Sequence, residues 1–326
     1  FGWRGDLMAN GQPCPGGHDG MGVIQTRKVG RSTEMVLVRN HEISGSSAGN
    51  FINAFGVYDS GNVSATSSNR SCGGTTNLVF RDGDWVSMTP SLGGTQQNCA
   101  GGVTPWGTWL TCEEVGSDAI TAGGKKHGYV FEVTVDPRQT TGQPIVNMGR
   151  FAHEAAAVDP TNCNVYLTED ASGKSGFYRY VPDIKTGAAG SLARGGVLEM
   201  AKVKGVNNVN LATASVDLTY ELEWVSIPNP DANRGNSVGL NGQAISNAAG
   251  PFNQGWAKGA LRMNRGEGIF YTKGKLYVMD TSGGPVNRGA IWELDLASQT
   301  LKCIYSSPSP LIGNMGDNLA VSPRDG

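Results

Sequence analysis

The sequence predicts an all-β protein built as a β-propeller, and two observations support this prediction. A unit of roughly 40 to 55 residues recurs along the chain, and each unit holds short runs rich in β-branched and aromatic residues, bounded by Gly, Asp and Ser turns. Glycine supplies 48 of the 326 residues without a collagen-like period, which suits many tight turns between short strands. Four-stranded units in series with this period are typical of a propeller, whose blades each bury one face against the next blade.

The units can be followed in order along the chain. The first is predicted around residues 19–90, with a strand at 34–39 and a Ser/Asn/Gly-rich insertion, and the second has strands at 108–114 and 128–133. Two later units have four strands each, and these strands are predicted at residues 153–160, 164–170, 176–180, 196–201, 266–271, 275–280, 289–294 and 301–305.

Two stretches fit the repeat less well. Residues 203–261 contain several Asn and Gly residues and are interpreted as a partial blade with a long loop. Residues 317–323 are interpreted as the first strand of another blade, and the chain ends soon after it. We therefore expect a single β-propeller domain over residues 1–326, with its last blade incomplete at the C-terminus.

Charge and hydropathy exclude two classes of partner. The formal net charge is -2, with 26 Lys and Arg against 28 Asp and Glu, so no basic excess is available for a nucleic-acid backbone or an anionic membrane. No apolar run approaches the ~20 residues of a membrane span. Residues 1–6 have neither the basic start nor the apolar centre of a signal peptide, so we expect any export signal to be absent from this chain. The oligomeric state is left open.

Cysteine usage argues against a structural zinc site. No Cys-x-x-Cys pair occurs, and no cysteine pairs with a histidine at zinc-finger spacing. An even number of cysteines permits three disulfides in an oxidising compartment, but the pairing is left open, and reserving one as a thiolate leaves an odd count. The six are Cys14, Cys72, Cys99, Cys112, Cys163 and Cys303.

Acidic residues recur at two positions of the repeating unit. In a blade the first strand starts, and the second ends, at the same rim, because antiparallel neighbours run in opposite directions. The residues before first strands are His153-Glu154, Arg265-Gly266-Glu267 and Asp317-Asn318, and those after second strands are Asn40-His41-Glu42, Cys112-Glu113-Glu114, Glu169-Asp170 and Asp280. We therefore expect these groups to share one rim.

A ring of carboxylates at one rim requires protonation or bound cations. Oxygen ligands favour calcium, whereas a thiolate such as that of Cys112 favours a softer transition metal, so a mixed cluster accounts for both. Acidic residues at strand ends are also common turn formers, and for any one of them the structural interpretation carries equal weight. Their joint recurrence favours a metal site.

Several motifs resemble those of the PhoX alkaline phosphatase family, over nearly the whole chain. The long stretch at residues 98–114 is highly specific, whereas the other stretches are short. They are Val38-Arg39-Asn40-His41-Glu42, Arg150-Phe151-Ala152-His153-Glu154, Thr168-Glu169-Asp170, Arg265-Gly266-Glu267-Gly268 and Asp317-Asn318. The chain departs from the family at Gly316, where a proline usually precedes the Asp-Asn pair, and at the incomplete last blade.

The resemblance implies a six-bladed propeller, export by the twin-arginine route to the periplasm or beyond, and hydrolysis of small phosphate esters at an iron and calcium cluster. It also implies that Cys112 binds iron, that Glu154 and Glu267 are metal ligands, and that Arg265 and Asn98 contact phosphate. The remaining metal ligands carried over from the family are Glu113, Asn40, Glu42, Asp170 and Asp317.

Three functions follow from these expectations. The first is metal-dependent phosphomonoester hydrolysis, which needs no serine nucleophile; none is indicated, and no G-x-x-x-x-G-K-[ST] loop occurs. The second is a non-catalytic, calcium-binding propeller that acts as a binding or structural module. The third is a lactonase-like hydrolase using calcium alone, for which Cys112 has no role, so the thiol discriminates between the first function and the other two.

Overall fold

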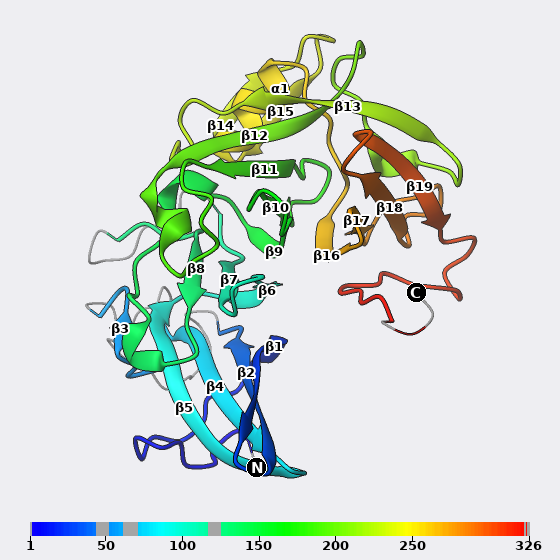
Figure 1. The fold of residues 1–326 in the computed structure, drawn as a ribbon. Helices are drawn as coiled ribbons and strands as arrows, with labels where there is room; N and C mark the ends of the chain where they lie inside the picture. The colour runs from blue at the N-terminus through cyan, green and yellow to red at the C-terminus, as the bar shows by residue number, and fades with distance from the viewer. Residues whose placement is uncertain (1, 44–51, 61–70, 117–124, 323, 325–326) are drawn as a thin grey trace.

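The computed structural model describes residues 2–43, 52–60, 71–116, 125–322 and 324, and its regular structure is almost entirely β (Figure 1). Antiparallel strands connected in sequence order form most of the sheets, which confirms the all-β prediction. Within these residues, no helix is long and apolar enough to cross a membrane. Cys14, Cys99, Cys112, Cys163 and Cys303 are free thiols.

The N-terminal sheet has five strands in the order β1-β2-β4-β5-β3. Its long hairpins are antiparallel, whereas the short β3 lies parallel to β5. The predicted unit at residues 19–90 corresponds to this sheet, although much of its Ser/Asn/Gly-rich insertion lies outside the described residues. The bounds are β1 His18–Val29, β2 Ser32–His41, β3 Gly56–Val57, β4 Gly73–Arg81 and β5 Asp84–Thr95.

A three-stranded sheet follows, in the order β6-β7-β8, with bounds Asn98–Val103, Trp109–Glu113 and Val130–Val133. The second and third of these strands match the predicted strands at 108–114 and 128–133. The first strand, β6, was not predicted, because Asn98–Val103 reads Asn-Cys-Ala-Gly-Gly-Val and has little β-branched or aromatic character.

Nine strands form the largest sheet, in the order β16-β17-β18-β19-β13-β12-β11-β10-β9. It consists of two four-stranded meanders that confirm the eight predicted strands, joined by β13, which pairs with β12 on one side and β19 on the other. The bounds are β9 His153–Val158, β10 Val165–Glu169, β11 Phe177–Pro182, β12 Gly196–Val203, β13 Thr219–Ser226, β16 Gly266–Thr272, β17 Lys275–Asp280, β18 Ala290–Asp295 and β19 Thr300–Ser306.

Two predicted partial blades differ from the structure. Residues 203–261 do not build a blade: they supply β13, the hairpin of β14 (Gly235–Val238) and β15 (Ala244–Ala248), and the helix α1 (Gly250–Ala257), which buries Phe252 and Trp256. The described part of residues 317–323 is not a strand, since Gly268 N donates to Asp317 O at 3.0 Å without a ladder forming.

The four inner strands β1, β6, β9 and β16 lie next to one another around one space in Figure 1. Together with residues 318–320 they line a groove of about 810 Å³. Their approach is close: a Cβ on Gly102 of β6 would lie 1.8 Å from Ala156 O of β9, so only glycine fits there. This packing brings the starts of the four strands together at one end.

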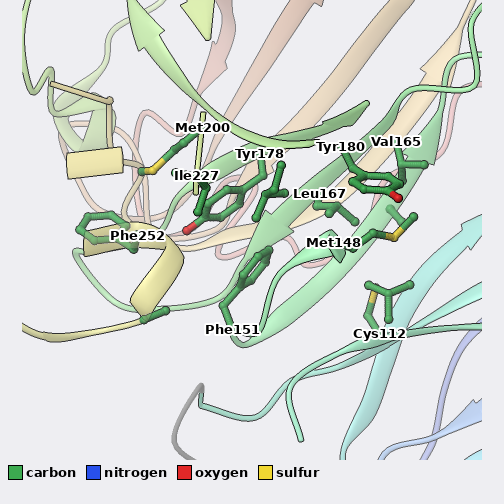
Figure 2. Packing of buried hydrophobic residues seen from close by; sticks show 14 of the residues in the cluster. Cys112, Met148, Phe151, Val165, Leu167, Tyr178, Tyr180, Met200, Ile227 and Phe252 are labelled. Atoms are coloured by element: carbon green, nitrogen blue, oxygen red, sulfur yellow. The ribbon is translucent and has the colours of Figure 1, made fainter. Parts of the chain in front are cut away.

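The core between the β7–β8 hairpin and the β9–β12 meander is apolar (Figure 2). Figure 2 shows Cys112 near Met148, with Tyr180 and Val165 of the meander close by. Burial of these side chains supplies the hydrophobic stabilisation that holds the two sheets together.

Candidate metal centre

Four acidic or thiol side chains occupy the same position in the four inner strands. Asp19, Cys99, Glu154 and Glu267 are each the second residue of β1, β6, β9 and β16, respectively. Because the four strands start at the same end, equal register brings these side chains to one place.

Ligand atoms in this place lie close enough to share a cation. The carboxylates of Glu154, Glu267 and Asp317 offer oxygens within 4.8 Å of one another, and Cys99 Sγ, Glu114 and Glu154 form a second such group. Glu154 and Glu267 are buried, and Asp317 is exposed. The structure therefore brings together three of the predicted ligands, Glu154, Glu267 and Asp317.

The second strands add a further row of acids. Glu42, Glu114 and Asp170 each follow directly after the last residue of β2, β7 and β10. Glu42 hydrogen-bonds to Asp19, and Glu114 hydrogen-bonds to Asp170. The predicted ligands Glu42 and Asp170 thus lie at the rim with Glu114, which the repeat also places there, and with Asp19, which the sequence reasoning missed.

Four buried or partly buried acids of this rim have raised pKa values. Burial, followed by repulsion from Glu42 and Asp317, raises the pKa of Asp19 to about 7. Burial and the charge of Asp170 raise the pKa of Glu114 to about 8 and that of Glu267 to about 9. The pKa of Glu154 is raised well above its usual range by burial and then by Glu267. Crowded carboxylates of this kind are stabilised by either protons or cations.

The last residue of each second strand points the other way, because side chains alternate along a strand. Glu113 accepts from the backbone N–H groups of Gly128 (2.8 Å) and Tyr129 (3.1 Å), so this predicted ligand organises the neighbouring loop instead of joining the rim. Glu169 likewise accepts from Gly176 N (2.9 Å), and Asp280 accepts from Arg265 N (2.9 Å). These carboxylates act as turn formers.

Cys112 does not reach the carboxylates. Its side chain is fully buried in the core of Figure 2, one residue out of phase with Glu113 along β7. The thiol of Cys99 lies instead beside β9, with Sγ 3.3 Å from His153 O and 3.6 Å from Glu154 O. The structure thus brings Cys99 of β6, and not the predicted Cys112 of the neighbouring strand β7, close to the carboxylates.

The two predicted asparagines are fully buried and bonded within the protein. Asn98 donates to Thr111 Oγ1 at 3.0 Å and accepts from Thr95 Oγ1 at 2.6 Å, so the structure does not place it at the rim. Asn40 donates to the backbone oxygens of Cys99 (3.0 Å) and Ala100 (2.7 Å). Asn40 therefore holds the strand that carries the thiol, without itself facing the carboxylates.

Arg265 is the cation of this rim. Its Nε donates to Asp170 Oδ1 at 2.7 Å, its Nη2 donates to Asp170 Oδ2, and Nη2 lies 2.8 Å from Glu267 Oε1. The hydrogen bond to Asp170 raises the pKa of Arg265 further, so the guanidinium is permanently charged. Arg265 therefore interacts with three acids of the rim, Asp170, Glu267 and Glu114.

The residues present fit a metal centre. Closely spaced carboxylates in excess over the single guanidinium are suited to hard divalent cations, and the adjacent thiol of Cys99 adds a ligand that softer transition metals prefer. The arrangement at the start of the inner strands is therefore of the kind found in all-β proteins with carboxylate-held metals.

Comparison with known proteins identifies the family. The model of the alkaline phosphatase PhoX family matches residues 81–301, and the chain belongs to that family of phosphatase enzymes. PhoX of Pseudomonas fluorescens, solved in complex with vanadate, a transition state analogue, has a similar fold: the TM-score is 0.60 at 20% identity, covering 93% of this chain and 71% of that chain. No curated protein matches the chain. The family expected from the motifs is confirmed.

Proposed function

We propose that this chain hydrolyses small phosphate monoesters at the rim formed by the starts of β1, β6, β9 and β16. The observation that carries the proposal is the common register of Asp19, Cys99, Glu154 and Glu267, which gathers oxygen and sulfur ligands beside one guanidinium. Membership of the PhoX family supports the reaction class.

Two kinds of cation suit the available ligands. Cys99, Glu154 and Glu114 would hold iron, because a thiolate favours a transition metal, and Glu154, Glu267 and Asp317 would hold calcium or iron through oxygen. Glu42, Asp170 and Asp19 stand beside them. When bound, such cations supply Lewis acidity toward phosphate oxygens and favour ionised carboxylates.

The chain's own residues have distinct tasks in this proposal. Arg265 grips two oxygens of the phosphoryl group, because a planar guanidinium matches that geometry. The carboxylate of Asp280 fixes the Arg265 backbone at one end of β16. Asn40 fixes the backbone of Cys99. The strand starts are thereby rigid, which favours a pre-organised site.

We also propose that the chain forms a β-propeller and is exported. β1, β6, β9 and β16 lie side by side, and each is the first strand of a run of antiparallel strands. This arrangement supports a β-propeller, and we propose six blades on the family resemblance. Export by the twin-arginine route to the periplasm or the exterior stays a prediction from the same resemblance.

Metal analysis combined with a phosphatase assay tests the proposed function. We expect purified protein to contain iron and calcium and to hydrolyse p-nitrophenyl phosphate, with activity lost on chelation and restored by the metals. Glu267→Gln should lower both metal content and activity at least tenfold, because it removes one of the three carboxylates of the Glu154–Glu267–Asp317 group. The matched control is Glu199→Gln, which lies in β12 and pairs with Arg179 at 2.8 Å. A fully active, metal-free protein would contradict the proposal.

A further inference from the structure

Asp170 and Arg265 meet across the rim between two neighbouring strands. Asp170 directly follows β10, and Arg265 directly precedes β16. The contact is side-on: Oδ1 accepts from Nε at 2.7 Å, and Oδ2 accepts from Nη2. Both oxygens of Asp170 thus accept from the guanidinium, the carboxylate also hydrogen-bonds to Glu114, and its side chain is only 9% exposed.

This pairing leaves the outer edge of the guanidinium open. Among the residues that the structure describes, Arg265 Nη1 has no hydrogen-bond partner, and 29% of the side chain is exposed. Nη2 also lies 2.8 Å from Glu267 Oε1, so the two N–H groups of Nη1 are the ones that the guanidinium can present to an anion. The open edge is thus available to an anion.

Both partners are also anchored through their backbones. Asp170 N donates to Ala152 O at 3.0 Å, two residues before Glu154. Arg265 N donates to Asp280 Oδ1 at 2.9 Å. A long, flexible arginine side chain loses conformational entropy when it binds an anion, and a partner that orients it beforehand reduces that cost. The pair therefore has the features of a fixed receptor.

We propose that Asp170 is a positioning residue that orients Arg265 for the phosphoryl group and is not a metal ligand. This inference rests on the proposed function, because it takes Arg265 as the phosphate contact. It assigns Asp170 a different role from the one that the family motifs predict. In agreement with it, the two groups of potential ligand atoms found at the rim do not include Asp170.

Inorganic phosphate is the probe for this role, used as a competitive inhibitor of the metal-loaded enzyme and in direct calorimetry. Asp170→Asn should raise the phosphate inhibition constant roughly tenfold, as removal of an orienting partner typically does, and should leave metal content per chain unchanged. Glu199→Gln serves as the control, since it breaks another side-on Arg–carboxylate pair, with Arg179, on an outer strand.

A double-mutant cycle separates orientation from an independent contribution. If Asp170 acts through Arg265, Asp170→Asn combined with Arg265→Lys should weaken phosphate binding no more than about twofold beyond Arg265→Lys alone. Should Asp170→Asn fail to fold, Asp170→Glu takes its place in the cycle, because it keeps the charge but displaces the guanidinium.

Three results would overturn the inference: loss of bound metal in the Asp170 variant, effects that multiply fully in the double variant, or an unchanged inhibition constant. Failure of the proposed function is distinguishable, because the unsubstituted, metal-loaded protein would then neither hydrolyse the ester nor bind phosphate.

Discussion

Glu113 and His127 form a buried pair in which Oε1 and Nδ1 are 2.7 Å apart, and both side chains are fully inaccessible. On its other side, His127 Nε2 lies 3.4 Å from Asp59 Oδ2 and 3.3 Å from Ser71 Oγ. Ser71 donates to Asp59 at 3.1 Å, so its proton is directed away from the imidazole. The buried Ser71, His127 and Glu113 side chains thus form a hydrogen-bonded group that connects three segments of the chain.

The His127 pair makes stability depend on pH. Burial alone lowers the pKa of His127, but the carboxylates of Glu113 and Asp59 outweigh it and raise the pKa above its ordinary value of 6.5. A raised histidine pKa stabilises the fold fully below pH 6.5 and loses that contribution as pH rises through the folded-state value. We expect the unfolding free energy from urea titrations to fall from pH 5.5 to pH 9. His127→Gln should cost about 3 kcal/mol at pH 5.5 and less at pH 9. Parallel pH curves for the two proteins would contradict this expectation.

Cys99 and Cys112 should respond differently to the same substitution. Cys99→Ser should abolish most iron binding, because the thiol beside Glu154 is lost, whereas Cys112→Ser should retain iron. In the core, a serine hydroxyl replaces an apolar thiol, so Cys112→Ser should lower the unfolding free energy by about 1–3 kcal/mol. Elemental analysis and thermal melts of both variants show which cysteine binds iron. Loss of iron from Cys112→Ser alone would indicate that Cys112, and not Cys99, is the ligand.

Metal-free protein should lose stability as pH rises. Burial and the nearby Asp170 raise the pKa of Glu267 to about 9, so the folded state holds a proton that the unfolded chain releases near pH 4.5. A raised carboxyl pKa contributes stability below the unfolded value and loses it between about pH 4.5 and 9. Melting temperatures of chelated protein should therefore fall over this range, and Glu267→Gln should flatten the slope. A slope that the substitution leaves unchanged argues against this origin.

The sequence predicted the site best where strands are strongly β-forming. Glu154 and Glu267 are the second residues of β9 and β16, two apolar strands that the repeat located correctly. Cys99 was missed because the inner strand β6 is glycine-rich and was not expected to be a strand. Glu113 does not face the rim because a difference of one residue reverses the direction of a side chain. Cys112 lies further inside β7, within the apolar core. Which residues of a strand face the rim depends on the register of that strand, and tertiary packing sets the register.

Substitution of Gly102, one of the glycines that made β6 hard to predict, tests the close packing of the inner strands. Gly102→Ala would place a Cβ 1.8 Å from Ala156 O, so β6 and β9 must separate. Overpacking of this kind costs about 1–3 kcal/mol, and here a backbone atom is the obstacle, so we expect the upper end of that range or more. The matched control is Gly235→Ala, where the nearest atom, Asn253 Nδ2, would be 3.6 Å from the new Cβ. Urea titrations should show a large loss of stability for the first variant and little change for the second.

Because β6 carries Cys99 and β9 carries Glu154, the Gly102→Ala variant should also bind less iron than the Gly235→Ala control at equal folded fraction. Equal stability and iron content in the two variants would refute the close approach of the inner strands.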